Sequence, residues 1–125
     1  KTAQLAAAGA EVTAVERDAG RVARLAMALR QEYKVGLLSN ATISLRGFLS
    51  ELGLLYLFDF VVISAEAGLR KPDPAIFRLT AIVAELDVSE CLLIDDKTRN
   101  TRAAEAVGMQ AIQFRSAAQA QREAM

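Results

Sequence analysis

Apolar runs and amphipathic stripes alternate along the whole chain. Five short runs rich in apolar residues are predicted to be β-strands: 12–16, 34–39, 60–64, 91–95 and 110–114. Three of these runs, 34–39, 60–64 and 91–95, show no alternation of apolar and polar positions. Such continuous runs are typical of strands that are covered on both faces of a parallel sheet.

Between the strands, apolar residues recur with the period of an amphipathic helix. The spacing predicts helices over 22–29, 45–52, 76–86 and 98–107, and shorter helices over 5–8 and 116–125. Pro74 stands where the third helix is expected to begin, and Ser116 stands where an N-cap is expected. This alternation predicts an α/β fold: a doubly wound, five-stranded parallel sheet with helices on both faces. No linker or repeat interrupts the pattern, so we expect a single domain over 1–125.

The composition narrows the chemistry that such a domain could perform. The chain has 125 residues, 53% of them hydrophobic, which is enough for one core without a metal or disulfide staple. Its 15 basic residues balance 15 acidic ones, so we expect neither nucleic acid nor a membrane as a partner. Cys91 is the single cysteine and histidine is absent, which excludes a disulfide, a Cys/His zinc site and histidine-dependent nucleophiles. Without a recognisable signal peptide, we expect a cytoplasmic protein.

Residues suited to ligand chemistry gather where the predicted strands end. They are Glu16, Asp18, Ser39, Asn40, Lys71, Asp95, Asp96 and Asn100. In a parallel sheet these ends meet at one edge, where α/β folds bind ligands. Paired carboxylates without histidine or cysteine favour Mg²⁺, and Mg²⁺ beside a lysine and a hydroxyl is what phosphoryl transfer requires. The alternative is that the strand-end aspartates only cap the following helices.

Three segments carry a resemblance to a known family. They are KVGLLSN at 34–40, GLRKPDPAIF at 68–77 and LLIDDKTRN at 92–100. In this order and at this spacing they resemble the second, third and fourth motifs of the haloacid dehalogenase superfamily, and the resemblance covers about residues 21–115. The family consists mostly of Mg²⁺-dependent phosphatases that use an aspartate nucleophile.

The resemblance implies a role for each matching residue. Ser39, Asn40 and Lys71 would bind the phosphate, with Lys71 neutralising its charge. Asp95 and Asp96 would hold Mg²⁺ directly or through water. Asn100 would orient their loop. The resemblance also implies that the strand of Glu16 is central, between the strands ending at Ser39 and Asp95, with 60–64 and 110–114 at the sheet edges.

The first motif of the family departs from its usual form. An apolar strand ending in DxDGT is expected, and this chain has VTAVERDAG at 12–20. Glu16 then takes the place of the nucleophile and Asp18 that of the general acid/base, and both would contribute to the metal site. A glutamate is one methylene longer, and a misplacement of about 1 Å can cost about 10²-fold in rate. Residues 19–33 leave room for one helix and no cap domain, so we expect a site open to water.

Residues 1–29 also resemble S-adenosylmethionine-dependent RNA cytosine methyltransferases, in which the acid at Glu16 would hold the cofactor ribose. The glycine-rich loop that would cradle that cofactor lies outside this sequence. Two resemblances in one chain raise the hypothesis of a chimera.

Three functional hypotheses therefore stand side by side. The first is a Mg²⁺-dependent phosphohydrolase core for a small phosphorylated substrate, weak or inactive because of its departed nucleophile motif. The second is a chimeric or designed α/β scaffold without activity. The third is an S-adenosylmethionine-binding methyltransferase fragment.

Overall fold

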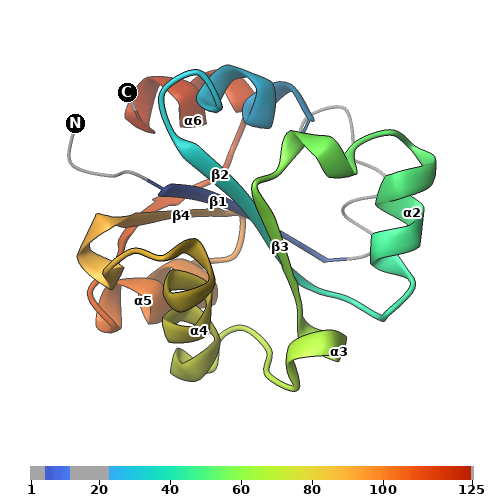
Figure 1. The fold of residues 1–125 in the computed structure, drawn as a ribbon. Helices are drawn as coiled ribbons and strands as arrows, with labels where there is room; N and C mark the ends of the chain where they lie inside the picture. The colour runs from blue at the N-terminus through green and yellow to red at the C-terminus, as the bar shows by residue number, and fades with distance from the viewer. Residues whose placement is uncertain (1–4, 12–22, 125) are drawn as a thin grey trace.

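A computed structural model describes residues 5–11 and 23–124 of the chain, and its strands and helices alternate (Figure 1). Besides a helical stretch at 23–29, the elements are β1 (Leu5–Glu11), β2 (Lys34–Asn40), α2 (Leu45–Glu51), η1 (Leu55–Leu57), β3 (Phe60–Ile63), α3 (Ser64–Ala67), α4 (Pro74–Ala84), η2 (Val88–Glu90), β4 (Cys91–Asp95), α5 (Thr98–Ala106), β5 (Gln110–Gln113) and α6 (Ala117–Ala124). The predicted α/β class is confirmed.

The strands form one sheet in the order β3-β2-β1-β4-β5, and every neighbouring pair is parallel. All strands therefore end at the same edge of the sheet, which we call the rim. Along β1 the register runs from Leu5 opposite Lys34 to Glu11 opposite Asn40. The last residues of β1, β2 and β4 are brought to neighbouring positions of the rim.

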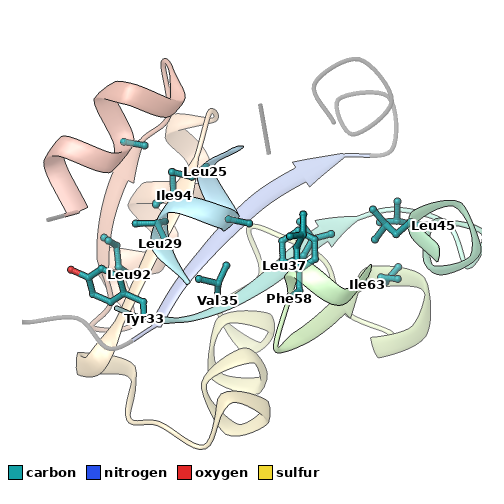
Figure 2. Close-up of a cluster of buried hydrophobic side chains, with 14 residues drawn as sticks. Leu25, Leu29, Tyr33, Val35, Leu37, Leu45, Phe58, Ile63, Leu92 and Ile94 are labelled. Atoms are coloured by element: carbon teal, nitrogen blue, oxygen red, sulfur yellow. The ribbon is translucent and has the colours of Figure 1, made fainter. Parts of the chain in front are cut away.

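Alternate residues of the strands enter two separate apolar cores, one on each face of the sheet. In β4, Leu92 and Ile94 belong to the core under the helical stretch at 23–29 and α6, whereas Cys91 and Leu93 belong to the core under α4 and α5. Figure 2 shows the first of these cores. Because both faces are covered, a strand with apolar residues at consecutive positions is stable, as the uninterrupted runs predicted.

The prediction of a helix over 5–8 is wrong, because these residues form the first part of β1. Alanine has the highest helix propensity, but its advantage amounts to less than about 0.7 kcal/mol per residue. Here the backbone is paired with β2 on one side and β4 on the other, and these ladders override the local preference. The central position in the sheet, expected for the strand ending at Glu16, is therefore held by an earlier segment. Residues 12–16, predicted to be a strand, lie outside the described residues.

Local signals at the helix ends are confirmed. Pro74 is the first residue of α4, and the Asp73 side chain caps it by accepting from the Ala75 N–H at 2.9 Å. The Ser116 hydroxyl accepts from the Gln119 N–H at 3.0 Å at the start of α6. Among the helices of the described ranges, none is long and apolar enough to cross a membrane.

Candidate active site

A buried ion pair lies at the rim between β2 and β4. The Lys71 Nζ donates to Asp95 Oδ2 at 2.7 Å, and each side chain is only 1% exposed. The Leu38 carbonyl of β2 accepts a second bond from Nζ at 3.2 Å. Lys71 comes from the irregular segment between α3 and α4, so tertiary structure joins it to Asp95 across 24 positions of sequence.

Two further donors converge on the Asp95 carboxylate. The Asn100 Nδ2 donates to Oδ2 at 3.2 Å, and the backbone N–H of Lys97 donates to Oδ1 at 2.9 Å. Charge pairing and hydrogen bonding together offset the free-energy cost of burying the Asp95 carboxylate. The Oδ1 of Asn100 is itself buried and has no hydrogen-bond partner among the described residues. The Nδ2 bond joins Asn100 to the end of β4, and its role in orienting the loop after β4 stays a prediction.

Asn40 and Ser39 end β2 beside this ion pair. The Asn40 amide exchanges two hydrogen bonds with the backbone of Lys71, at 2.9 and 3.0 Å. Ser39 is completely buried. The structure therefore brings together five of the residues singled out from the sequence: Ser39, Asn40, Lys71, Asp95 and Asn100.

Asp96 differs from Asp95 in its surroundings. Its side chain is exposed, and partial burial, followed by repulsion from the neighbouring Asp95 carboxylate, raises its pKa. A cation beside Asp96 would relieve that repulsion. The carboxylates of Asp95 and Asp96 suit Mg²⁺, which proteins hold through one or two carboxylates plus waters. No cluster of three or more metal-ligating side chains is found within 5–11 and 23–124, so Asp95 and Asp96 form a pair of carboxylates rather than a complete ligand set.

β1 brings one further acid to the rim, which sequence reasoning missed. Glu11 is its last residue and lies opposite Asn40 in the register. It is also the only ionisable residue of β1. The signal that could have found it is the acid at the end of the small-residue run LAAAGAE. Glu16 and Asp18, the predicted nucleophile and acid/base, lie outside the described residues.

A pocket of about 390 Å³ opens elsewhere, between α2 and η1. It is lined by Ser50, Gly53, Leu55 and Tyr56. None of the predicted site residues lines this pocket, so it is not part of the candidate site at the rim.

Comparison with known proteins finds relatives of this chain. A relative, the phosphoserine phosphatase of Thermus thermophilus, is 34% identical over 90 residues, which are 70% of this chain and 36% of the relative. The chain thus spans about a third of the length of that relative.

Solved structures share the fold. An uncharacterised protein from Corynebacterium glutamicum is 24% identical with a TM-score of 0.74, covering 94% of this chain and 90% of that one. A HAD phosphatase from Thermococcus onnurineus is 26% identical with a TM-score of 0.69, covering 81% of this chain and 51% of that one. A HAD family enzyme from Bacteroides thetaiotaomicron, in complex with magnesium and inorganic phosphate, is 23% identical with a TM-score of 0.64, covering 85% and 54%.

The family model of the haloacid dehalogenase-like hydrolases matches residues 3–108. This range extends through most of the segment at 1–29 that resembles a methyltransferase, and the comparisons give no support to a methyltransferase fragment or a chimera. The match covers most of the chain, including the ion pair at the rim. The chain therefore belongs to the haloacid dehalogenase-like hydrolase family.

Proposed function

We propose that this chain is the core of a Mg²⁺-dependent phosphohydrolase that acts on a small phosphate monoester. The observation that carries the proposal is the buried pair of Lys71 and Asp95 at 2.7 Å, held at the carboxyl ends of parallel strands. A buried ion pair is an expensive way to stabilise a fold compared with apolar packing. Its position at the edge where parallel sheets bind ligands favours a catalytic use. The phosphatase relatives are consistent with a phosphate ester as substrate.

Lys71 is the residue that would neutralise the phosphoryl charge. An ammonium group has three N–H donors. Two of them are engaged by Asp95 and the Leu38 carbonyl in the described part of the chain. The third is available for a phosphoryl oxygen, and Asp95 keeps the ammonium oriented. The Ser39 hydroxyl and the end of β2 would position the same phosphoryl group.

Asp96 would ligate Mg²⁺ directly, whereas Asp95 would act through a water because its oxygens already accept three hydrogen bonds. When bound, the metal would supply charge neutralisation for phosphoryl transfer. The remaining carboxylate must come from Glu11, Glu16 or Asp18. Glu11 is supported by its register position at the rim, and Glu16 and Asp18 by their match to the first motif.

A glutamate in place of the aspartate nucleophile leads us to propose weak or no turnover. The longer side chain shifts the carboxylate relative to Lys71 and the phosphoryl group, and in-line attack tolerates little displacement. Shortening the responsible glutamate to aspartate should therefore raise activity.

The experiment is hydrolysis of p-nitrophenyl phosphate and of phosphoserine with and without Mg²⁺, in the parent chain and in Glu11→Asp and Glu16→Asp. We expect Mg²⁺-dependent hydrolysis that rises at least about tenfold in one of the two variants. Glu105→Asp makes the same change on the exposed side of α5 and serves as the matched control. If the parent chain, Glu11→Asp and Glu16→Asp all fail to hydrolyse either ester in millimolar Mg²⁺, the inactive scaffold is the better description.

Calorimetry with S-adenosylmethionine tests the hypothesis of a methyltransferase fragment, for which we expect no heat of binding.

A further inference from the structure

The Asn40 side chain forms two hydrogen bonds with the Lys71 backbone, which the position of Asn40 in the second motif does not predict. Its Nδ2 donates to the Lys71 carbonyl at 3.0 Å, and its Oδ1 accepts from the Lys71 backbone N–H at 2.9 Å. The two residues are 31 positions apart in sequence. A side-chain amide here replaces the backbone partner that a β-ladder would provide. The last residue of β2 therefore holds the backbone from which the catalytic lysine projects.

β2 contacts the other end of the same lysine. The Leu38 carbonyl accepts from Nζ at 3.2 Å, so two residues of one strand bracket Lys71 from its backbone to its ammonium group. The segment 68–73 that carries Lys71 contains neither helix nor strand. One turn hydrogen bond, from the Asp73 N–H to the Arg70 carbonyl at 2.9 Å, spans Lys71, and the Asn40 amide bonds both backbone groups of Lys71 itself. The two Asn40 bonds are partly buried, and hydrogen bonds shielded from water are stronger than fully exposed ones.

We propose that Asn40 is a positioning residue, whose amide fixes the Lys71 backbone and so determines where the ammonium group meets Asp95 and an incoming phosphoryl oxygen. The amide oxygen and one N–H of Nδ2 are bonded to the Lys71 backbone, and through these two bonds Asn40 would act on substrate by way of the lysine. The phosphoryl part of this inference rests on the proposed function. The restraint on Lys71 does not, because it follows from contacts within the chain.

The chain contains a matched control for this arrangement. The Ser64 hydroxyl donates to the Ala41 carbonyl at 3.1 Å and accepts from the Ala41 N–H at 2.9 Å. This is the same two-way pairing of a side chain with a backbone, one residue further along the chain from Asn40. It ties the first residue of α3 to the residue that follows β2, and both of these bonds go to Ala41 rather than to Lys71. Ser64→Ala therefore removes a comparable pair of hydrogen bonds without loosening the lysine.

The test measures how fast each lysine reacts with an amine-specific acylating reagent, by mass spectrometry of the folded protein. In the parent chain Lys71 is 2% exposed and should react far more slowly than the partly exposed Lys97, which serves as the internal reference. We expect Asn40→Ala to raise the Lys71 rate relative to Lys97 by about tenfold or more, since two partly buried hydrogen bonds to the Lys71 backbone are lost. Ser64→Ala should leave that ratio unchanged.

Asn40→Asp provides a second variant should the alanine variant fail to fold. Its carboxylate can accept from the Lys71 N–H but cannot donate to the Lys71 carbonyl, so we expect a labelling ratio between those of the parent and the alanine variant. A Lys71 ratio unchanged in every folded Asn40 variant, or raised as much by Ser64→Ala as by Asn40→Ala, would overturn the inference.

The labelling needs no turnover, so its failure is distinguishable from a failure of the phosphatase proposal. If the parent hydrolyses p-nitrophenyl phosphate, the combined effect of Asn40→Ala and Lys71→Ala on kcat/KM should equal that of Lys71→Ala alone. A residue that acts only through Lys71 has nothing left to position once the lysine is removed. Additive losses would show that Asn40 acts independently of Lys71 and would count against the inference.

Discussion

Lys71 and Asp95 form an ion pair of 2.7 Å at the carboxyl ends of β2 and β4, and both side chains are buried. One residue comes from an irregular segment and the other ends a core strand. The pair joins the third and fourth of the motifs that resemble the family, so variants of these two residues can test both the chemistry and the stability of the rim.

Removing one charge of this pair should destabilise the fold severely. We expect Lys71→Met to cost about 3–5 kcal/mol, because it leaves the Asp95 carboxylate buried and uncompensated. The double variant Lys71→Met with Asp95→Asn should be less destabilised than Lys71→Met alone. Urea unfolding monitored by circular dichroism measures each free energy of unfolding.

The exposed pair of Arg46 and Glu66 is the control for this comparison. Their side chains lie 2.8 Å apart but are 43% and 37% exposed. Arg46→Met should cost no more than about 1 kcal/mol, as is usual for surface pairs. Equal costs at the two pairs would mean that burial at the rim has no energetic consequence.

Asp96 should couple stability to magnesium. We expect millimolar Mg²⁺ to raise the Tm of the parent chain, by the equivalent of about 1.4 kcal/mol at ten times the Kd. Asp96→Asn should abolish the rise. Thermal melts with Mg²⁺ and with EDTA provide the measurement, and a rise that persists in the variant would place the metal elsewhere.

Asp96→Asn should also slightly stabilise the metal-free protein at neutral pH. The pKa of Asp96 is raised by partial burial and by Asp95, so the fold disfavours its charged form. This unfavourable contribution develops as pH rises above the ordinary aspartate pKa and disappears in acid, where the carboxyl is protonated in both states. The gain should therefore shrink as pH is lowered towards 3, which melts in EDTA across that range can measure.

Gly36 should not tolerate a side chain. It lies opposite Phe60 in the register of β2 and β3, and a Cβ at Gly36 would overlap the aromatic ring. We expect Gly36→Ala to cost about 1–3 kcal/mol from overpacking. A Cβ at Gly47 in α2 would meet nothing within 4 Å, and Gly47→Ala should stabilise by up to about 1 kcal/mol through helix propensity. Opposite signs in chemical unfolding are the expected outcome, and a stabilising Gly36→Ala would contradict the packing.

Glu85 ends α4 in the left-handed conformation, with φ of 62°. Glycine adopts this conformation without a Cβ penalty, so we expect Glu85→Gly to stabilise by about 0.5–1 kcal/mol. The same substitution at Glu105, inside α5, should destabilise by about 1 kcal/mol. Thermal melts of the two variants provide the comparison, and destabilisation by both would argue against strain at Glu85.

The buried Cys91 thiol should make stability fall in alkaline solution. Burial, more than the nearby acids Glu90 and Asp87, raises its pKa from 9.0 to about 11. Because the folded pKa exceeds the unfolded one, the contribution is complete below pH 9 and is lost as pH rises from 9 to about 11. Urea midpoints between pH 8 and 11 should fall more steeply for the parent than for Cys91→Ala, which cannot titrate at this position. Parallel slopes would contradict the shift.

The sequence was sufficient for β2, β3, β4 and β5, because each is a compact apolar run bounded by polar residues and turn signals. It was also sufficient to place the strand-end residues Ser39 and Asp95 at one edge, since parallel strands bring their carboxyl ends together. Asn100 bonds to Asp95 in the structure, and its role in orienting the loop after β4 stays a prediction from the family motif.

Only the tertiary structure decided which segment forms the centre of the sheet and what Asn40 does. The run LAAAGAE has the local propensity of a helix, and pairing with strands on both sides makes it β1 instead. That pairing makes Glu11 the last residue of a central strand, opposite Asn40 in the register. The hydrogen-bond partners of Asn40 cannot be predicted from the sequence either, because a side-chain amide can bond to a substrate or to the protein backbone. Asn40 bonds to Lys71 because the segment after α3 folds back over β2. This contact joins residues 31 positions apart, and interactions between sequence neighbours cannot determine it.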